Sequence, residues 1–150
     1  MQFEEFTQEL DKRGIAATPI RILVLKTMHS EQYAVSLTDL ESKMLTVDKS
    51  SIFRTLTLFL SHHLVHCIDD GSGSLKYALC SPNCHCGEGM HDDTGELHTH
   101  FYCERCHRTF CLRGLPVPMV KLPKDFKLHT ANYVLKGLCP NCAAKQDNQL

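Results

Sequence analysis

The chain has 150 residues, of which 43% are hydrophobic and 22% charged, and its formal net charge is −1, a composition typical of a soluble globular protein. No apolar run approaches the roughly 18 residues of a membrane span, and the acidic, amphipathic N-terminus is not a secretion signal, so we expect a cytoplasmic protein without a membrane partner. The weak charge excludes nucleic-acid binding by bulk attraction, so any DNA contact has to come from a local arrangement of side chains.

Four short helices are predicted in the first part of the chain. They cover residues 3–13, Pro19 to about Ser30, a segment that begins at Ser36, and Asp48 or Ser50 to about His62. Gly14 is suited to end the first helix, and Thr18 is suited to cap the second. Each segment has apolar residues at helical spacing, so the four helices are expected to share one core.

A β-hairpin is predicted after the helices. Residues 64–68 and 75–79 are extended runs on either side of a turn that contains Gly71 and Gly73, which readily adopt positive φ. Cys67 alternates with His66 and is expected to face the core. Helices followed by a two-stranded hairpin are typical of a winged helix-turn-helix.

The fourth helix is the predicted recognition helix. If Ile52 and Phe59 face inward, the outer positions are Ser51, Phe53, Arg54 and Thr57. Arg54 could reach guanine or phosphate, and the Phe53 ring could touch a thymine methyl group. The alternative is a solvated helix face with one exposed aromatic ring.

The second half of the chain is rich in metal-binding residue types. Of the nine cysteines and ten histidines, only His29 lies in the first 60 residues. Residues 81–97 are expected to form a loop that carries Cys84, His85, Cys86 and His91. Strands are predicted around 98–103, 108–112 and within 126–138, and the tail 143–150 is expected to be frayed.

Two Cys-x-x-Cys pairs indicate a structural zinc site. The two-residue gap aims both sulfurs of a pair at one point, and two pairs supply the four thiolates of tetrahedral zinc. The pairs are separated by 32 residues, so the zinc would join distant segments. The predicted ligands are Cys103, Cys106, Cys139 and Cys142.

His98 and His100 indicate a second metal site. Residues two apart on a strand share one face, so these imidazoles would project together, while Cys103 would face the other side. Ligands would have to come from elsewhere in the chain. Alternatively, His98 and His100 are two surface histidines. The loop residues Cys84, His85, Cys86 and His91 could bind an extra metal or replace a ligand of this site, or they could belong to a loop without a metal.

Several motifs occur in an order that resembles a known family. They are Thr18-x-x-Arg21, Ser51-Ile52-Phe53-Arg54-Thr55-Leu56, Leu64-Val65, a glycine-containing wing ending in Tyr77, His98-x-His100-x-x-Cys103-x-x-Cys106 and Cys139-x-x-Cys142. The sequence resembles the ferric uptake regulator family of metal-sensing repressors. This resemblance implies an α+β protein that binds operator DNA as a homodimer: a winged-helix domain (1–80), a Cys/His-rich hinge loop (81–97) and an α/β dimerisation domain with the four-cysteine zinc (98–150).

The resemblance also implies a sensory metal site. The set His66, Cys80, His98 and His100 is similar to that of the zinc uptake regulator branch, and Ala34 and Ala78 stand where iron sensors usually have His and Glu. A thiolate favours Zn²⁺ over Fe²⁺ or Mn²⁺, which remain the alternatives. Cys111, at a commonly acidic position of the family, is a further candidate ligand.

Geometry agrees with this assignment, because His66 and Cys80 lie at the two ends of one hairpin and could pair across it. A metal shared with His98 and His100 would clip the hairpin to the second half of the chain. We expect DNA contacts from Arg54, Lys49 and the wing residue Lys76, with Arg13 and Arg21 as phosphate contacts.

The sequence is compatible with two alternative functions and argues against a third. An iron or peroxide sensor keeps the same fold with another metal. A zinc adaptor that binds protein is compatible with the weak charge. A zinc hydrolase or deaminase is not expected, because the chain has neither His-x-Glu nor His-Glu-x-x-His and no acid placed to activate zinc-bound water.

Overall fold

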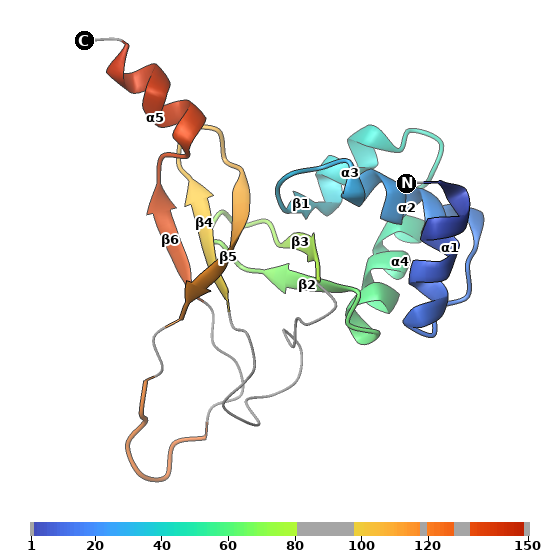
Figure 1. The fold of residues 1–150 in the computed structure, drawn as a ribbon, viewed down its shortest axis with the longest axis horizontal. Helices are drawn as coiled ribbons and strands as arrows, with labels where there is room; N and C mark the ends of the chain where they lie inside the picture. The colour runs from blue at the N-terminus through green and yellow to red at the C-terminus, as the bar shows by residue number, and fades with distance from the viewer. Residues whose placement is uncertain (1, 81–97, 118–119, 128–132, 149–150) are drawn as a thin grey trace.

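The computed structural model describes residues 2–80, 98–117, 120–127 and 133–148, apart from the side chains of residues 98, 113, 114 and 116. The helices are α1 (Phe3–Lys12), α2 (Pro19–His29), α3 (Leu37–Lys43), α4 (Lys49–Ser61) and α5 (Pro140–Asp147). The strands are β1 (Val35–Ser36), β2 (Val65–Ile68), β3 (Lys76–Leu79), β4 (His98–Cys103), β5 (Thr109–Pro116) and β6 (Val134–Gly137). The predicted α+β class is confirmed (Figure 1).

The predicted helix starts are confirmed by their caps. The Thr18 hydroxyl accepts from the Arg21 amide at the start of α2, where Pro19 is the first residue. Ser36 and Asp39 form a capping box on α3, and the Asp48 carboxylate accepts from the Ser51 amide at the start of α4.

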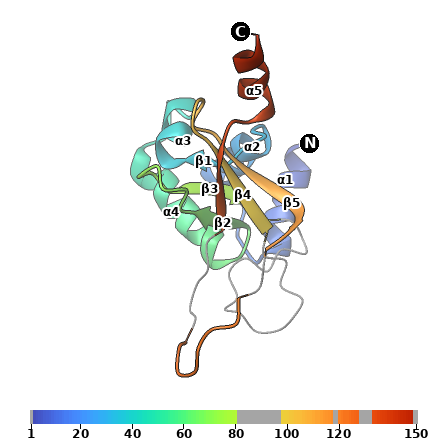
Figure 2. The ribbon, with the colours of Figure 1, turned by 90° about the vertical axis from the view of Figure 1, so that its left-hand side faces the viewer.

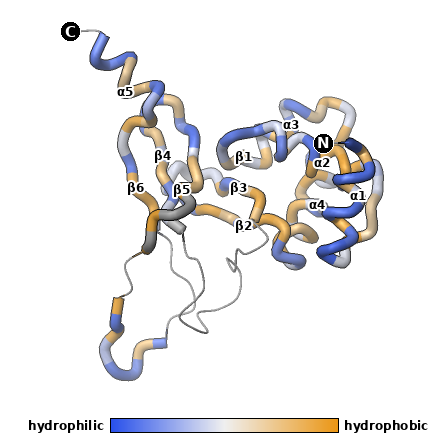
Figure 3. Tube along the Cα trace, in the orientation of Figure 1, coloured by the Kyte–Doolittle hydropathy of each residue, from blue (hydrophilic) through white to orange (hydrophobic). Residues whose placement is uncertain are grey.

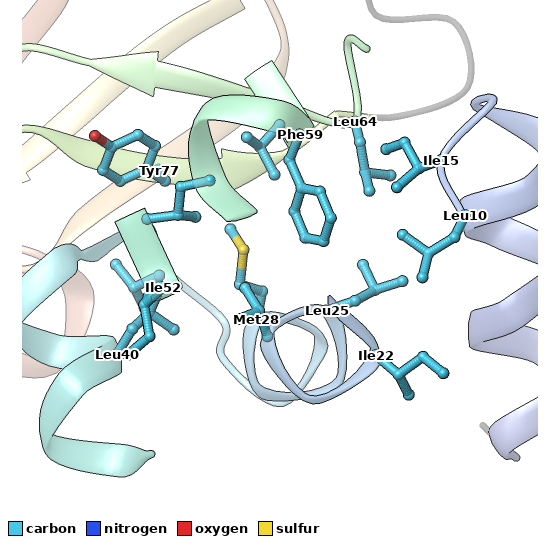
Figure 4. Close-up of a cluster of buried hydrophobic side chains, with 14 of the residues drawn as sticks. Leu10, Ile15, Ile22, Leu25, Met28, Leu40, Ile52, Phe59, Leu64 and Tyr77 are labelled. Carbon is cyan, nitrogen blue, oxygen red and sulfur yellow. The ribbon is translucent and has the colours of Figure 1, made fainter. Parts of the chain in front are cut away.

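One apolar core holds α1 to α4 and the adjoining strands together. Side chains from all four helices meet around Phe59, which is fully buried in α4 (Figure 4). Leu10 of α1, Leu25 of α2 and Tyr77 of β3 belong to the same buried cluster. Burial of an apolar side chain of this size stabilises a fold by about 1.5–3 kcal/mol, so this core fixes the position of α4.

The β2–β3 hairpin with its turn, residues 65–79, is called the wing below. β3 lies between β1 and β2 in an antiparallel sheet, and Gly71 and Gly73 take positive φ in the turn. Strand β1 was not predicted; its two residues pair with Tyr77 and Lys76 of β3. β2 is mostly hydrophobic in Figure 3, and its Val65 and Ile68 side chains are buried.

β4, β5 and β6 form the C-terminal sheet. β4 lies at its centre, antiparallel to β5 and parallel to β6, and α5 follows β6. The wing runs from the helices to this sheet (Figures 1 and 2). A bridge between Ala34 and Thr109 joins the two parts directly. None of the described helices is long and apolar enough to cross a membrane.

The expectation of a frayed tail from residue 143 was wrong. α5 continues to Asp147 because Pro140 occupies its first turn, Cys142 is buried against the C-terminal sheet, and good helix formers follow. Two of the four paired cysteines are therefore placed by this helix and its cap.

Candidate metal centres

The paired cysteines converge at one end of the C-terminal sheet. Cys103 ends β4 and Cys106 lies in the turn that follows, while Cys139 caps α5 and Cys142 lies in its first turn. One sulfur from each residue lies within 4.8 Å of all the others. Cys103, Cys139 and Cys142 are buried, so the cluster is shielded from water.

The spacing of these sulfurs fits tetrahedral zinc. Zinc–sulfur bonds of about 2.3 Å would place neighbouring sulfurs about 3.8 Å apart. Cys106 Sγ lies 3.9 Å from Cys139 Sγ, and the Cys139 amide donates to Cys103 Sγ at 3.3 Å. This set of four sulfur donors, three of them buried and Cys106 half-buried, is typical of a structural site.

Acidity differs among these thiols. Burial acts to raise the pKa of Cys103, but backbone amides around it, first that of Cys106 and then that of Cys139, outweigh burial and lower the pKa to about 6. Burial and the neighbouring thiols raise the pKa of Cys142 to about 12. Cys103 therefore ionises readily by itself, and a divalent cation would supply the charge needed to ionise Cys106 and Cys142, whose pKa values are raised.

A second cluster joins the wing to the C-terminal sheet. His66 Nε2 of β2 lies 3.3 Å from His100 Nε2 of β4 and 3.4 Å from Cys111 Sγ of β5. His100 and Cys111 are direct partners across β4 and β5, so both side chains lie on the face toward the wing. His66 is 5% exposed, and the other two are half-buried.

The three atoms fit one zinc ion. Zinc bonds of about 2.0–2.1 Å to nitrogen and about 2.3 Å to sulfur would place tetrahedral ligand atoms about 3.4–3.6 Å apart. The distances of 3.3 and 3.4 Å from His66 Nε2 match this spacing. In the described part of the chain, no carboxylate joins the three residues in this cluster.

Cys80 lies on the other side of the His66 ring. Its sulfur is 3.3 Å from Nδ1, and its amide pairs with the Leu64 carbonyl, so Cys80 is diagonal to His66 and not opposite it. The partner opposite His66 is Ala78. When Nε2 holds a metal, Nδ1–H can donate to Cys80 Sγ and fix the orientation of the ring.

Other residues predicted as ligands lie partly or wholly outside the described residues. His98 starts β4, but its side chain is not described. The same applies to the whole of Cys84, His85, Cys86 and His91.

Cys67 was expected to face the core. This expectation was wrong, because His66 lies on the buried face of β2 and Cys67 is exposed.

The predicted DNA-contacting residues divide into two groups. Lys49, Phe53, Arg54 and Thr57 are exposed on α4, and half-buried Ser51 accepts a hydrogen bond from Arg54 Nη2 at 3.3 Å. The expected inward residues Ile52, Leu56 and Phe59 are buried. α4 therefore presents two basic side chains, Lys49 and Arg54, and one aromatic side chain, Phe53, to solvent.

The remaining basic residues of that prediction are already bound to protein groups. Lys76, expected on the exposed surface of the wing, is 7% exposed and its Nζ lies 2.8 Å from Asp70 Oδ2. Arg13 donates to the His63 carbonyl at 3.0 Å, and Arg21 donates to the Ala16 carbonyl at 2.8 Å. In this conformation the Lys76 ammonium does not face a DNA phosphate.

The sequence matches no family model and no curated protein, but the fold matches solved structures. A zinc uptake regulator complexed with zinc and DNA has a TM-score of 0.63 at 20% identity, covering 97% of this chain and 95% of its own. The ferric uptake regulator of Pseudomonas aeruginosa, with manganese, has a TM-score of 0.56 at 20% identity, covering 89% and 97%. That of Vibrio cholerae has a TM-score of 0.58 at 17% identity, covering 89% and 98%.

The chain therefore has the fold of the ferric uptake regulator family over most of its length. Regulators named for iron and for zinc match it at similar identity, so this likeness defines the fold and not the metal.

Proposed function

We propose that this chain is a dimeric, DNA-binding transcriptional regulator that responds to zinc through a site held by His66, His100 and Cys111. The observation that carries the proposal is the meeting of these three side chains from β2, β4 and β5. A metal bound there would tie the wing to the C-terminal sheet. The proposed function is regulatory and not enzymatic, and we expect it in the cytoplasm.

The metal would act by shifting a conformational equilibrium. The wing is continuous with α4 through residues 62–64, so the wing and the recognition helix move together. A metal that binds only when the wing lies against the C-terminal sheet stabilises that arrangement. The size of the shift is set by the difference between the metal affinities of the two arrangements. A shift from 1:99 to 99:1 requires about 5.5 kcal/mol, well below the apparent energy of about 10–16 kcal/mol that zinc supplies at structural sites.

The donor atoms support zinc as the metal. Two imidazole nitrogens and one thiolate suit zinc, whereas iron(II) and manganese(II) sites commonly include oxygen ligands. Tetrahedral zinc takes a fourth ligand, for which His98 is the candidate predicted from the sequence, since Cys80 faces Nδ1 of His66 and not Nε2. The four-cysteine cluster is proposed as a separate, structural zinc site because protein supplies all four ligands of tetrahedral zinc there.

DNA recognition is assigned to the exposed face of α4. Arg54 and Phe53 are the base-contacting candidates, and Lys49 is a phosphate contact. Two copies of α4 on a two-fold dimer would have to enter major grooves about 34 Å apart, so the angle between the helices and the C-terminal sheet decides whether both fit.

Dimerisation is assigned to the C-terminal half, where apolar side chains remain exposed. Leu115 is 49% exposed, Phe126 69% and Leu135 42%. Burial of these side chains against a second copy would remove their apolar surface from water. A second copy of the chain is the partner that a symmetric DNA site requires.

The proposal is tested by zinc titration of DNA binding, using fluorescence anisotropy of a labelled operator selected from random DNA. His100→Ala should weaken zinc-dependent binding by at least about tenfold while the dimer stays folded. His107→Asn is the matched control, because His107 is an exposed histidine of the β4–β5 turn at φ 62, which Asn tolerates. Zinc-dependent binding by His100→Ala at the wild-type level would contradict the proposal, and the absence of DNA binding under all conditions would favour the adaptor.

A further inference from the structure

One face of β4 and β5 contacts the wing at two places. His100 pairs with Cys111, and Tyr102 pairs with Thr109, so the four side chains lie on the same face of the C-terminal sheet. His100 and Cys111 contact His66 in the candidate metal site. Tyr102, two residues after His100, and Thr109, two residues before Cys111, meet a different part of the wing.

The second contact is a buried network that contains no metal-ligand candidate. Thr109 Oγ1 donates to Asp70 Oδ2 at 2.5 Å, and Lys76 Nζ donates to the same oxygen at 2.8 Å. Asp70 is 1% exposed and Thr109 is fully buried. The Lys76 ammonium also lies 5.6 Å from the centre of the Tyr102 ring, a cation–π contact between the wing and β4.

Thr109 also holds the segment between α2 and β1. Its carbonyl accepts from the Ala34 amide at 2.7 Å. The two neighbours of Thr109 contact the Tyr33 ring. The Arg108 guanidinium carbon lies 4.6 Å from the centre of that ring, and the centre of the Phe110 ring lies 6.4 Å from it. Thr109 therefore joins β5 to the wing through its side chain and to the segment before α3 through its backbone.

We propose that the Thr109–Asp70 hydrogen bond is a latch that positions the wing on the C-terminal sheet without metal. Lys76 balances the Asp70 charge within the wing, and Thr109 is the positioning residue that couples this pair to the sheet. A hydrogen bond to a buried charge is among the stronger kinds because the low local dielectric favours it. The metal would thus bind across a junction that is already aligned, and its affinity would be higher than at a loose junction.

The latch is tested in the full-length protein after mild chelation that leaves the four-cysteine site loaded, by hydrogen exchange with mass spectrometry. Thr109→Val removes the hydroxyl and keeps the side-chain shape, so wing amides 69–76 should exchange about tenfold faster. Thr109→Ser keeps the hydroxyl and should exchange like the wild type. Thr99→Val is the matched control, because Thr99 is also buried in β4 but its hydroxyl bonds within the sheet, to the Leu115 carbonyl.

Wing exchange in Thr109→Val equal to that of the wild type would overturn the latch. Equal acceleration in Thr99→Val, in Thr109→Ser, or across β4 and β6 would also overturn it, because the effect would then be general destabilisation. The effect of the latch on DNA binding rests on the proposed function, but the exchange measurement does not. Faster wing exchange in Thr109→Val together with zinc-independent DNA binding would support the latch and contradict the proposed sensor. Unchanged wing exchange together with zinc-dependent DNA binding would contradict the latch and support the sensor.

Discussion

His66 is contacted through both nitrogens of its ring. Nε2 faces His100 and Cys111, and Nδ1 faces Cys80. The sequence could predict that His66 and His100 belong together, because the family resemblance pairs them. The sequence could identify Cys111 only as a further candidate ligand, because the pairing of His100 with Cys111 depends on the register of two strands and not on local sequence.

Cys111 should determine the metal preference of the proposed sensory site. Cys111→Asp replaces sulfur with a harder oxygen donor, so zinc affinity should fall by roughly tenfold or more relative to iron(II) or manganese(II). Competitive titration with a chromophoric chelator measures this change. Cys67→Ser, at an exposed cysteine of the same wing, is the control. Unchanged zinc affinity in Cys111→Asp would exclude Cys111 as a ligand.

Asp70 should make stability depend on acid pH. Burial acts to raise the pKa of Asp70, but hydrogen bonds from Lys76, Ser72 and Thr109 outweigh it and hold the pKa well below its usual range. A group whose pKa is lowered by folding contributes stability above its unfolded pKa of about 3.9, and this contribution is lost as pH falls toward the folded pKa.

Asp70→Asn should therefore lower the free energy of unfolding near neutral pH by about 3–5 kcal/mol, because it leaves the Lys76 charge buried without its partner. Urea unfolding of both proteins measures the difference, which should shrink below about pH 4 because the unfolded wild-type chain takes up a proton on Asp70 while the folded protein keeps its carboxylate. A difference that stays constant from pH 7 to pH 3 would contradict an ionised Asp70.

The helices were predictable because their signals are local. Caps such as Thr18, Ser36 and Asp48 and the helical spacing of apolar residues lie within a few positions of each helix. β1 was missed because two residues carry no periodicity, and it exists through its pairing with β3. α5 was missed although Pro140 is a start signal, because the segment beyond it is short and polar.

The four-cysteine cluster should decide whether the C-terminal elements form. Cys103→Ser removes the ligand that ends β4, so the zinc site, β6 and α5 should lose order together, because structural zinc supplies much of the folding energy of small sites. Hydrogen exchange and size-exclusion chromatography would show a loosened C-terminal half and loss of the dimer. Cys67→Ser should stay within about 0.5 kcal/mol of the wild type. An intact dimer of Cys103→Ser would contradict the structural assignment.

Helix α4 should carry DNA affinity separately from metal affinity. Arg54→Ala should weaken operator binding by about 1–3 kcal/mol if Arg54 contacts a base, with zinc affinity unchanged. The matched control is Lys26→Ala, at an exposed basic residue of α2. Anisotropy and chelator competition on the same samples separate the two effects. Full DNA affinity in Arg54→Ala would assign recognition to another surface.

At the scale of the whole molecule, the wing couples the helices to the C-terminal sheet, together with the segment before β1 that pairs with Thr109. The sequence predicted a metal clip between them but not the Thr109–Asp70 contact, because residues 39 positions apart carry no local signal of their meeting. The same long-range packing explains why Lys76 was expected on the surface: a lysine in a turn-flanking strand is usually solvated, and only the buried Asp70 makes its burial favourable.

The central claim is that one metal ion held between the wing and the C-terminal sheet sets DNA affinity. The most direct measurement is zinc content per monomer, taken before and after mild chelation, on the samples whose operator affinity is measured. We predict two zinc ions per monomer before chelation and one after it, with DNA affinity lost together with the first ion and restored by stoichiometric zinc. In His100→Ala, one ion should be present throughout and affinity should stay low. Operator affinity that is the same with one zinc ion as with two would contradict the account.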